Sequence, residues 1–213
     1  MDWQRSLYLL PGILLGLTVH ECCHALCAYK LGDNTARDQG RLTLNPLKHI
    51  DIVGFIFLLV VGFGWAKPVQ FSPENLKNYR RDKALIAAAG PLSNLILGTL
   101  LALSTKLMLH LLINGIISHS EVIMTLFTVL YLAAYINFVL FIFNLIPIPP
   151  LDGSHIVFSI LNISSETEAK IRTIGMPALF VILLVQNFAN ITILPIGKAI
   201  DALIRLFGLG MLL

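Results

Sequence analysis

Residues 7–29 read LYLLPGILLGLTVHECCHALCAY, an apolar block that carries His20, Glu21 and His24 in its second half. A helix needs about 20 mostly apolar residues to cross a bilayer, so this block predicts a membrane-spanning helix. Ionisable side chains inside such a helix are costly to bury and usually functional. The same stretch therefore indicates both the class of fold and the place to look for chemistry.

Further apolar blocks follow along the chain, at residues 84–117, 122–146, 176–194 and 196–213. The first three are long enough, or nearly so, for a spanning helix, and the last is marginal. The 213 residues are 56% hydrophobic with a mean hydropathy of +0.81, whereas soluble domains are roughly 45–50% apolar. These features predict an all-α polytopic membrane protein built as a bundle of transmembrane helices.

The chain is predicted to form a single domain over residues 1–213. Its core is expected at residues 7–157, and additional C-terminal helices are expected within 174–213, after a polar linker at 162–173. Glycine, asparagine and proline clusters bound the apolar blocks and place the ends of the helices. The predicted core helices are 7–31, 84–112 and 122–145.

The segment between the first two core helices is expected to enter the membrane without crossing it. Residues 52–65 are apolar but number only 14. As a helix they would reach about 21 Å, short of a bilayer core of about 30 Å. Just before them, Arg41 to Leu44 alternate polar and apolar side chains, which favours a short β-strand. We therefore predict a short re-entrant and β segment here.

Basic residues concentrate in one stretch, and their position predicts the topology. Nine of the fifteen lie between residues 30 and 83, whereas residues 114–121 contain none. By the positive-inside rule, the 30–83 stretch faces the cytoplasm and the 114–121 turn faces outside. Acidic residues interrupt the stretch without an aromatic stacking pattern, so a nucleic-acid surface is not predicted. The nine basic residues are Lys30, Arg37, Arg41, Lys48, Lys67, Lys77, Arg80, Arg81 and Lys83.

Residues 20–24 read His-Glu-Cys-Cys-His, which has the form H-E-x-x-H. On a helix, positions i and i+4 lie on one face, so His20 and His24 can present two imidazoles to one metal ion. Glu21 lies beside them, as the general base does in zinc proteases. The alternative interpretation is a hydrogen-bonded polar cluster between helices. The three cysteines, Cys22, Cys23 and Cys27, are expected to act as small apolar packing residues and to form no disulfides.

A catalytic zinc site usually has three protein ligands, and Asp152 is the leading candidate for the third. It lies in Pro-Pro-Leu-Asp-Gly, residues 149–153, just after a long apolar segment. Alone, Asp152 would be interpreted as a turn or N-cap residue, and His155 is a rival ligand. If residues 52–65 do not cross, Asp152 falls at the cytoplasmic end, and His24 lies roughly 10 Å below that surface. The charge rule and the three-ligand requirement thus favour one topology.

Three motifs in one order resemble a known family. They are the 20–24 motif, Gly-Pro-Leu-Ser-Asn at 90–94, and Asn-Leu-Ile-Pro-Ile-Pro-Pro-Leu-Asp-Gly at 144–153. Together they resemble the site-2 protease family of intramembrane zinc metalloproteases, over the chain from His20 to about Val157. Residues 42–51, which read Leu-Thr-Leu-Asn-Pro-Leu-Lys-His-Ile-Asp, resemble a compact prokaryotic branch of that family.

This resemblance implies a zinc-dependent endopeptidase that cleaves transmembrane segments of membrane-protein substrates and thereby releases a membrane-tethered regulator. In the resemblance, His20, His24 and Asp152 match the family's zinc ligands. Glu21 matches its catalytic base. Asn144 matches a polar residue near the zinc, which implies an oxyanion stabiliser.

Asn94 matches the family's Gly-Pro-x-x-Asn element, which implies structural support for the site or for the re-entrant segment. For Asn94 and for Asn144, an interhelical hydrogen bond is an equally good interpretation. Residues 40–45 are expected to offer a strand edge to an extended substrate.

Two other classes of protein compete with an enzyme. A membrane metal transporter or metal-binding protein would share the ligands but need no base, and transporters often contain internal repeats, which this sequence lacks. A catalytically inactive scaffold would have no need of the complete motif set. The predicted partners are transmembrane protein substrates and the lipid bilayer, with no nucleic acid. The predicted location is a prokaryotic cell membrane, with the active site toward the cytoplasm.

Overall fold

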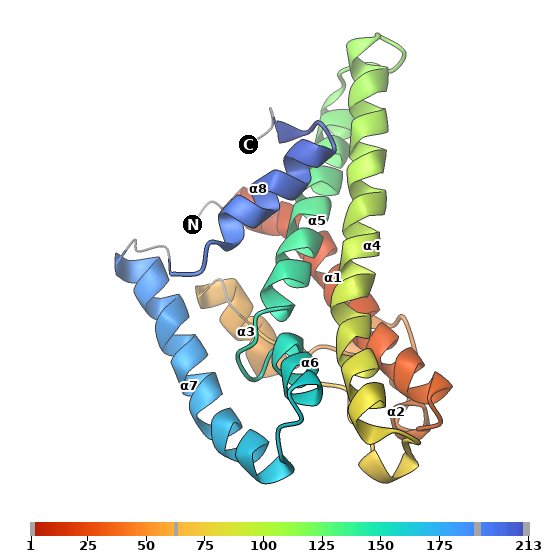
Figure 1. Ribbon diagram of the computed structural model, residues 1–213. Coiled ribbons are helices and arrows are strands. Elements are labelled where there is room, and N and C mark those ends of the chain that lie inside the picture. Colours follow the sequence, from red (N-terminus) through yellow and green to blue (C-terminus); the bar gives the residue numbers. More distant parts are fainter. Residues whose placement is uncertain (1–2, 62–63, 190–192, 211–213) are drawn as a thin grey trace.

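The computed structural model describes residues 3–61, 64–189 and 193–210. Three of its helices are long and apolar enough to cross a membrane: residues Leu7–Lys30 of α1 (Trp3–Lys30), α4 (Tyr79–Ile113) and α5 (Glu121–Asn144). Within the described residues every element longer than a single bridge is helical. The prediction of an all-α polytopic membrane protein is thereby confirmed (Figure 1).

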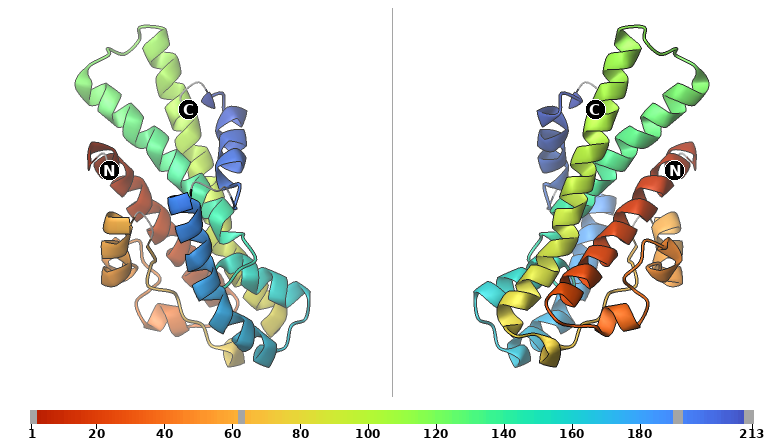
Figure 2. Two further views of the ribbon diagram at one scale, coloured as in Figure 1. Left: turned by 90° about the vertical axis from the view of Figure 1, so that its left-hand side faces the viewer. Right: turned by 90° about the vertical axis from the view of Figure 1, so that its right-hand side faces the viewer.

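The core is formed by α1, α4 and α5, each of which packs against the other two. Figures 1 and 2 show α4 and α5 as a long antiparallel pair crossed by α1. Close approach depends on glycine, because a Cβ at Gly12 would lie 2.6 Å from the Cα of Ala133 and one at Gly16 would lie 2.9 Å from the Oδ1 of Asn137. Small residues of this kind let membrane helices pack backbone to backbone. The next turn of α1 therefore lies deep in the three-helix junction.

Caps set the helix starts that the hydropathy pattern misplaced. Helix α4 begins at Tyr79, five residues before the predicted start, because the Asn78 side chain accepts a hydrogen bond from the Arg81 backbone N–H at 3.3 Å. The predicted linker at 162–173 is largely helical, which corrects that prediction. Helix α7 (Ser165–Ala189) starts there because the Ser164 hydroxyl accepts from the Thr167 N–H at 3.3 Å.

Between α1 and α4 lie α2 (Thr35–Asp38), η1 (Pro46–Lys48), α3 (Ile52–Val61) and η2 (Pro73–Asn75). The predicted strand at 41–44 is wrong: in the described part of this segment the only β pairing is one bridge between Ile50 and Ala66. Helix α3 has 10 residues, about 15 Å, which agrees with a segment too short to cross. Residues 62–63 of the predicted re-entrant segment lie outside the described residues.

A side chain, and not a β ladder, joins Arg41 to residues 67 and 68. The guanidinium of Arg41 donates to the backbone carbonyls of Lys67 and Pro68. Those carbonyls follow Ala66, which forms its single β bridge with Ile50. Residues 40–45 therefore do not form the strand edge that was expected for a substrate.

Asp33 fastens the loop before α4 to the end of α1. Its fully buried carboxylate accepts from the backbone N–H and hydroxyl of Thr35 at 3.1 and 2.6 Å. It also accepts from the Ser72 N–H at 2.9 Å and the Asn75 amide at 2.7 Å. Burial alone would raise the pKa of this carboxyl, but the four hydrogen bonds hold the pKa below its usual value.

We expect Asp33→Ala to lower the free energy of unfolding by about 2 kcal/mol, because it leaves the part-buried hydrogen bonds of the Ser72 N–H and the Asn75 amide without their acceptor. The measurement is thermal or denaturant unfolding of the detergent-solubilised protein. Asp38→Ala is the matched control, because the Asp38 carboxylate is exposed and pairs with its neighbour Arg37. Equal stability of the two variants would contradict the anchoring role of Asp33.

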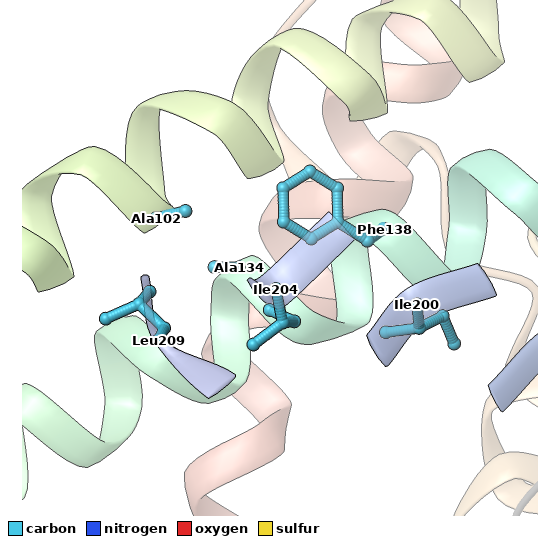
Figure 3. Close-up of a cluster of buried hydrophobic side chains, with 6 residues drawn as sticks. All are labelled: Ala102, Ala134, Phe138, Ile200, Ile204 and Leu209. Carbon is cyan, nitrogen blue, oxygen red and sulfur yellow. The ribbon is translucent and has the colours of Figure 1, made fainter. Parts of the chain in front are cut away.

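The C-terminal part adds α6 (Asp152–Ile160), α7 and α8 (Ile196–Leu206). Helix α8 has 11 residues, about 16 Å, too short to span. Its Ile200 and Ile204 belong to one buried cluster with Phe138 and Ala134 of α5 (Figure 3). Its Lys198, Asp201 and Arg205 give it an amphipathic character typical of an interfacial helix. Residues 211–213 lie outside the described residues.

Helix α7 is long, but it is not among the candidate spans. Its first half carries Glu166, Glu168, Lys170 and Arg172. It runs apart from the α1, α4 and α5 core in Figure 1. A buried ion pair between Lys83 of α4 and Glu168, with 2.5 Å between Nζ and Oε2, ties its start to the bundle.

Candidate metal centre

His20 and His24 lie one turn apart on α1, and the chain after α5 turns back to bring Asp152 beside them. The two Nε2 atoms are 2.9 Å apart. The Oδ2 atom of Asp152 lies 3.1 Å from the Nε2 of His20 and 3.3 Å from the Nε2 of His24. His20 and His24 are only 5% and 6% exposed, so the three ligand atoms meet inside the bundle. Asp152 is the first residue of α6, which packs against α4.

The outer nitrogen of each imidazole is already bonded. The Nδ1 of His20 lies 2.7 Å from the Oδ1 of Asn94, and the Nδ1 of His24 lies 2.7 Å from the carbonyl oxygen of Ile86. A carbonyl oxygen can only accept, so each Nδ1 carries the proton and donates. Each Nε2 then presents a lone pair toward the centre.

Three acceptors therefore converge on one small space, and they need a cation. The Oδ2 of Asp152 is buried and has no hydrogen-bond partner. An anionic carboxylate facing two imidazole lone pairs is stable only with a positive charge between them.

The donor set and its dimensions fit zinc. Zinc bonds to nitrogen and oxygen are about 2.0–2.2 Å, which puts tetrahedral ligand atoms about 3.3 Å apart. The observed separations run from 2.9 to 3.3 Å. Two imidazoles and one carboxylate make a catalytic zinc set that leaves a fourth position open, whereas calcium and magnesium prefer oxygen ligands alone.

Gly90 of α4 closes one side of this space. A Cβ there would lie 2.6 Å from the Nε2 of His20 and closer still to the Nε2 of His24. Glycine at this position lets the α4 backbone approach both imidazoles without covering their lone pairs.

We expect Gly90→Ala to weaken zinc binding by on the order of 10-fold or more, because its methyl group presses on both ligand nitrogens. Zinc bound per chain after dialysis against a chelator series is the measurement. Gly197→Ala is the control, because a Cβ at Gly197 meets no atom within 4 Å. Parent-like zinc binding by Gly90→Ala would mean that α4 moves away at little cost.

Glu21 is held by a segment distant in sequence. Its Oε2 accepts from the backbone N–H of Val69 at 3.0 Å and lies 4.0 Å from a guanidinium nitrogen of Arg41. Arg41 is 4% exposed, and burial lowers the pKa of its guanidinium, although Glu21 acts in the opposite direction. Sequence reasoning missed Arg41 and Val69 as neighbours of Glu21, because neither position carries a periodic or motif signal.

The predicted asparagines take different places. Asn94 touches the site directly through His20, and it also donates to the Oδ1 of Asn137 at 3.0 Å. Asn137 on α5 was not predicted, although a lone amide in an apolar helix is a recognisable signal. Asn144 donates to the carbonyl of Leu140 at 2.9 Å, one turn back on its own helix.

The rival ligand His155 faces away from the metal centre. Its Nε2 accepts from the guanidinium of Arg172 at 2.9 Å, and its Nδ1 lies 3.4 Å from Glu168. Burial and the neighbouring cations Arg172 and Lys83 lower the pKa of His155 to about 4. His155 therefore belongs to the ion-pair cluster at the start of α7. The three cysteines are free thiols, as predicted.

Comparison with known proteins gives one family. The family model described as "Peptidase family M50" matches residues 8–186. A Bacillus subtilis (strain 168) protein named "Putative zinc metalloprotease YwhC" is 43% identical over 150 residues, which cover 70% of this chain and 67% of that protein. No solved structure matches the chain.

Two mycobacterial relatives are more distant. Proteins named "Putative zinc metalloprotease Rip2", from Mycolicibacterium smegmatis and Mycobacterium tuberculosis, are 28% and 27% identical over 149 residues. The match covers 68% of this chain and 53% of each of them, so the chain spans about half the length of these relatives. Because the family model covers most of the chain, this multi-pass membrane protein belongs to peptidase family M50, the site-2 protease family of zinc metalloproteases.

Proposed function

We propose that the chain is an intramembrane endopeptidase that cuts transmembrane segments of other membrane proteins. In this proposal His20, His24 and Asp152 hold the zinc ion. The observation that carries it is the convergence of these three ligand atoms, all within 4.8 Å of one another, among helices apolar enough to span a membrane. A substrate dissolved in water would not reach a site at such a depth in the membrane.

The depth of the site supports this location for the reaction. His24 lies six residues before Lys30, where α1 ends, which is about 9 Å along the helix axis. The basic stretch from residue 30 to 83 lies at this end of the bundle and supports a cytoplasmic orientation. We therefore propose that the active site opens toward the cytoplasm of a prokaryotic cell and meets substrates within the inner half of its membrane.

Zinc, when bound, polarises the scissile carbonyl and lowers the pKa of water. We propose Glu21 as the general base, which takes a proton from the attacking water and passes it to the leaving amine. The Val69 N–H and Arg41 hold one oxygen of Glu21, so the carboxylate is oriented before substrate arrives. A helical substrate must unwind at the cut, because a helix hides its carbonyls in hydrogen bonds.

Asn144 is proposed to donate a hydrogen bond to the developing oxyanion. Its amide donates to Leu140 within its own helix, so a rotation of the side chain is needed to redirect it. The Asn144 residue is partly exposed, which leaves room for such a rotation.

The test is cleavage in lipid vesicles that contain the protein and a tagged single-span substrate. We expect mass spectrometry to locate the cut inside the apolar segment, and we expect a chelator to abolish cleavage and added zinc to restore it. The comparison substrate is a soluble protein that carries the same apolar sequence outside the bilayer, between polar flanks.

Other outcomes are distinguishable. Cuts only in the soluble flanks would indicate a membrane-anchored protease of ordinary loops. Zinc binding without cleavage of any single-span substrate would favour the inactive scaffold. Zinc flux across the vesicle wall would favour a transporter.

A further inference from the structure

Asn137 lies in the second half of α5 and reaches into the junction with α1 and α4. Its side chain is fully buried, as is that of Asn94. Gly16 makes room for it, since a Cβ there would lie 2.9 Å from the Oδ1 of Asn137. Buried amides in an apolar bundle need hydrogen-bond partners, and here the nitrogen and the oxygen of each amide have at least one.

The hydrogen bonds are all donated in one direction, from the His20 imidazole through Asn94 and Asn137 to a backbone carbonyl. The Nδ2 of Asn137 donates to the carbonyl of Ala133 at 2.8 Å, a group that can only accept. The Oδ1 of Asn137 therefore faces Asn94, whose Nδ2 donates to it at 3.0 Å and to the carbonyl of Gly16 at 3.1 Å. The Oδ1 of Asn94 is thereby turned toward the Nδ1 of His20.

The direction matters because an amide can be reversed. A reversed Asn94 would set its oxygen against two acceptors, the carbonyl of Gly16 and the Oδ1 of Asn137. It would also point an N–H group at the Nδ1 of His20, which would move the imidazole proton to Nε2. An Nε2 that carries a proton has no lone pair for a metal.

We propose that Asn137 is a positioning residue of the zinc centre: through Asn94 it holds His20 in the form that is protonated at Nδ1 and free at Nε2. This inference rests on the proposed ligand role of His20. Partners of metal-bound imidazoles typically change metal affinity by about 10–100-fold when they are removed. Asn94 acts on His20 directly, and Asn137 acts one step further out.

The test uses the purified full chain in detergent with Zn²⁺ alone as the probe. We expect Asn137→Leu to weaken zinc binding by on the order of 10-fold in competition with a chelator, because Asn94 loses the acceptor that orients it. Asn137→Asp keeps an oxygen opposite the Nδ2 of Asn94, so we expect it to bind zinc more tightly than Asn137→Leu. Thr105→Val is the control, since Thr105 is fully buried on α4 but donates only to Leu101 of its own helix.

A second readout separates positioning from packing. The visible absorption of Co²⁺ bound in place of zinc reports the ligand geometry, and we expect Asn137→Leu to change it while Thr105→Val does not. Circular dichroism shows whether each variant is folded. If Asn137→Leu does not fold, Asn137→Ser replaces it, because the serine side chain is too short to reach Asn94. We expect Asn137→Ser to show the same weaker zinc binding and the same change in the cobalt spectrum.

Two results would overturn the inference. One is a folded Asn137→Leu protein with parental zinc affinity and cobalt spectrum, and the other is equal weakening by Asn137→Asp and Asn137→Leu. A parent protein that binds no zinc is a different result, because it overturns the proposed metal centre itself.

Discussion

Purified Asp152→Asn protein is expected to retain less than about a tenth of a zinc ion per chain, whereas the parent retains about one. The substitution keeps the shape of the side chain but removes the anionic oxygen that faces His20 and His24. Two neutral imidazoles then remain in a buried site that no longer compensates a divalent charge.

Elemental analysis of the detergent-solubilised proteins, purified without chelators, measures this effect. Asp38→Asn is the control, because Asp38 is an exposed aspartate outside the cluster of candidate ligands and pairs with Arg37. Circular dichroism shows whether each variant is folded. A folded Asp152→Asn protein that keeps one zinc per chain would remove Asp152 from the ligand set.

Glu21→Gln is expected to keep zinc and to lower the rate of cleavage by on the order of 10³-fold. Glutamine keeps an oxygen that can accept from the Val69 N–H, so the local structure should persist. It cannot take up a proton from water or return it to the leaving amine. In Glu21→Gln we therefore expect cleavage to fall while the zinc content stays at the parental level. In Asp152→Asn we expect both to fall.

Cleavage of the tagged single-span substrate in vesicles, beside zinc analysis of the same preparation, measures the second effect. Glu74→Gln is the matched control, because Glu74 is exposed on η2. Undiminished cleavage by a pure Glu21→Gln preparation would assign the base to another residue. Loss of zinc from Glu21→Gln would make Glu21 part of the metal site instead.

Local pattern was sufficient for the features that depend on neighbouring residues. Apolar length predicted the spans in α1, α4 and α5, and the four-residue spacing of His20 and His24 placed both on one face. The alternation at residues 41–44 misled, because a strand also needs a partner edge, and in the described part of this segment the only β pairing is the bridge between Ile50 and Ala66. Polarity at 162–173 misled for a related reason, since Ser164 caps a helix that hydropathy alone does not reveal.

By itself the sequence determined the membrane class, the helix that carries the chemistry, the family resemblance and a short set of candidate ligands. These depend on hydropathy, periodicity and motif order, which are read along the chain. Tertiary structure alone decided that Asp152 rather than His155 joins the two imidazoles, that Val69 and Arg41 hold Glu21, and that Asn94 turns His20. Each of those contacts joins residues tens of positions apart, and hydrogen bonds are decided by ångström-scale packing that no local pattern encodes.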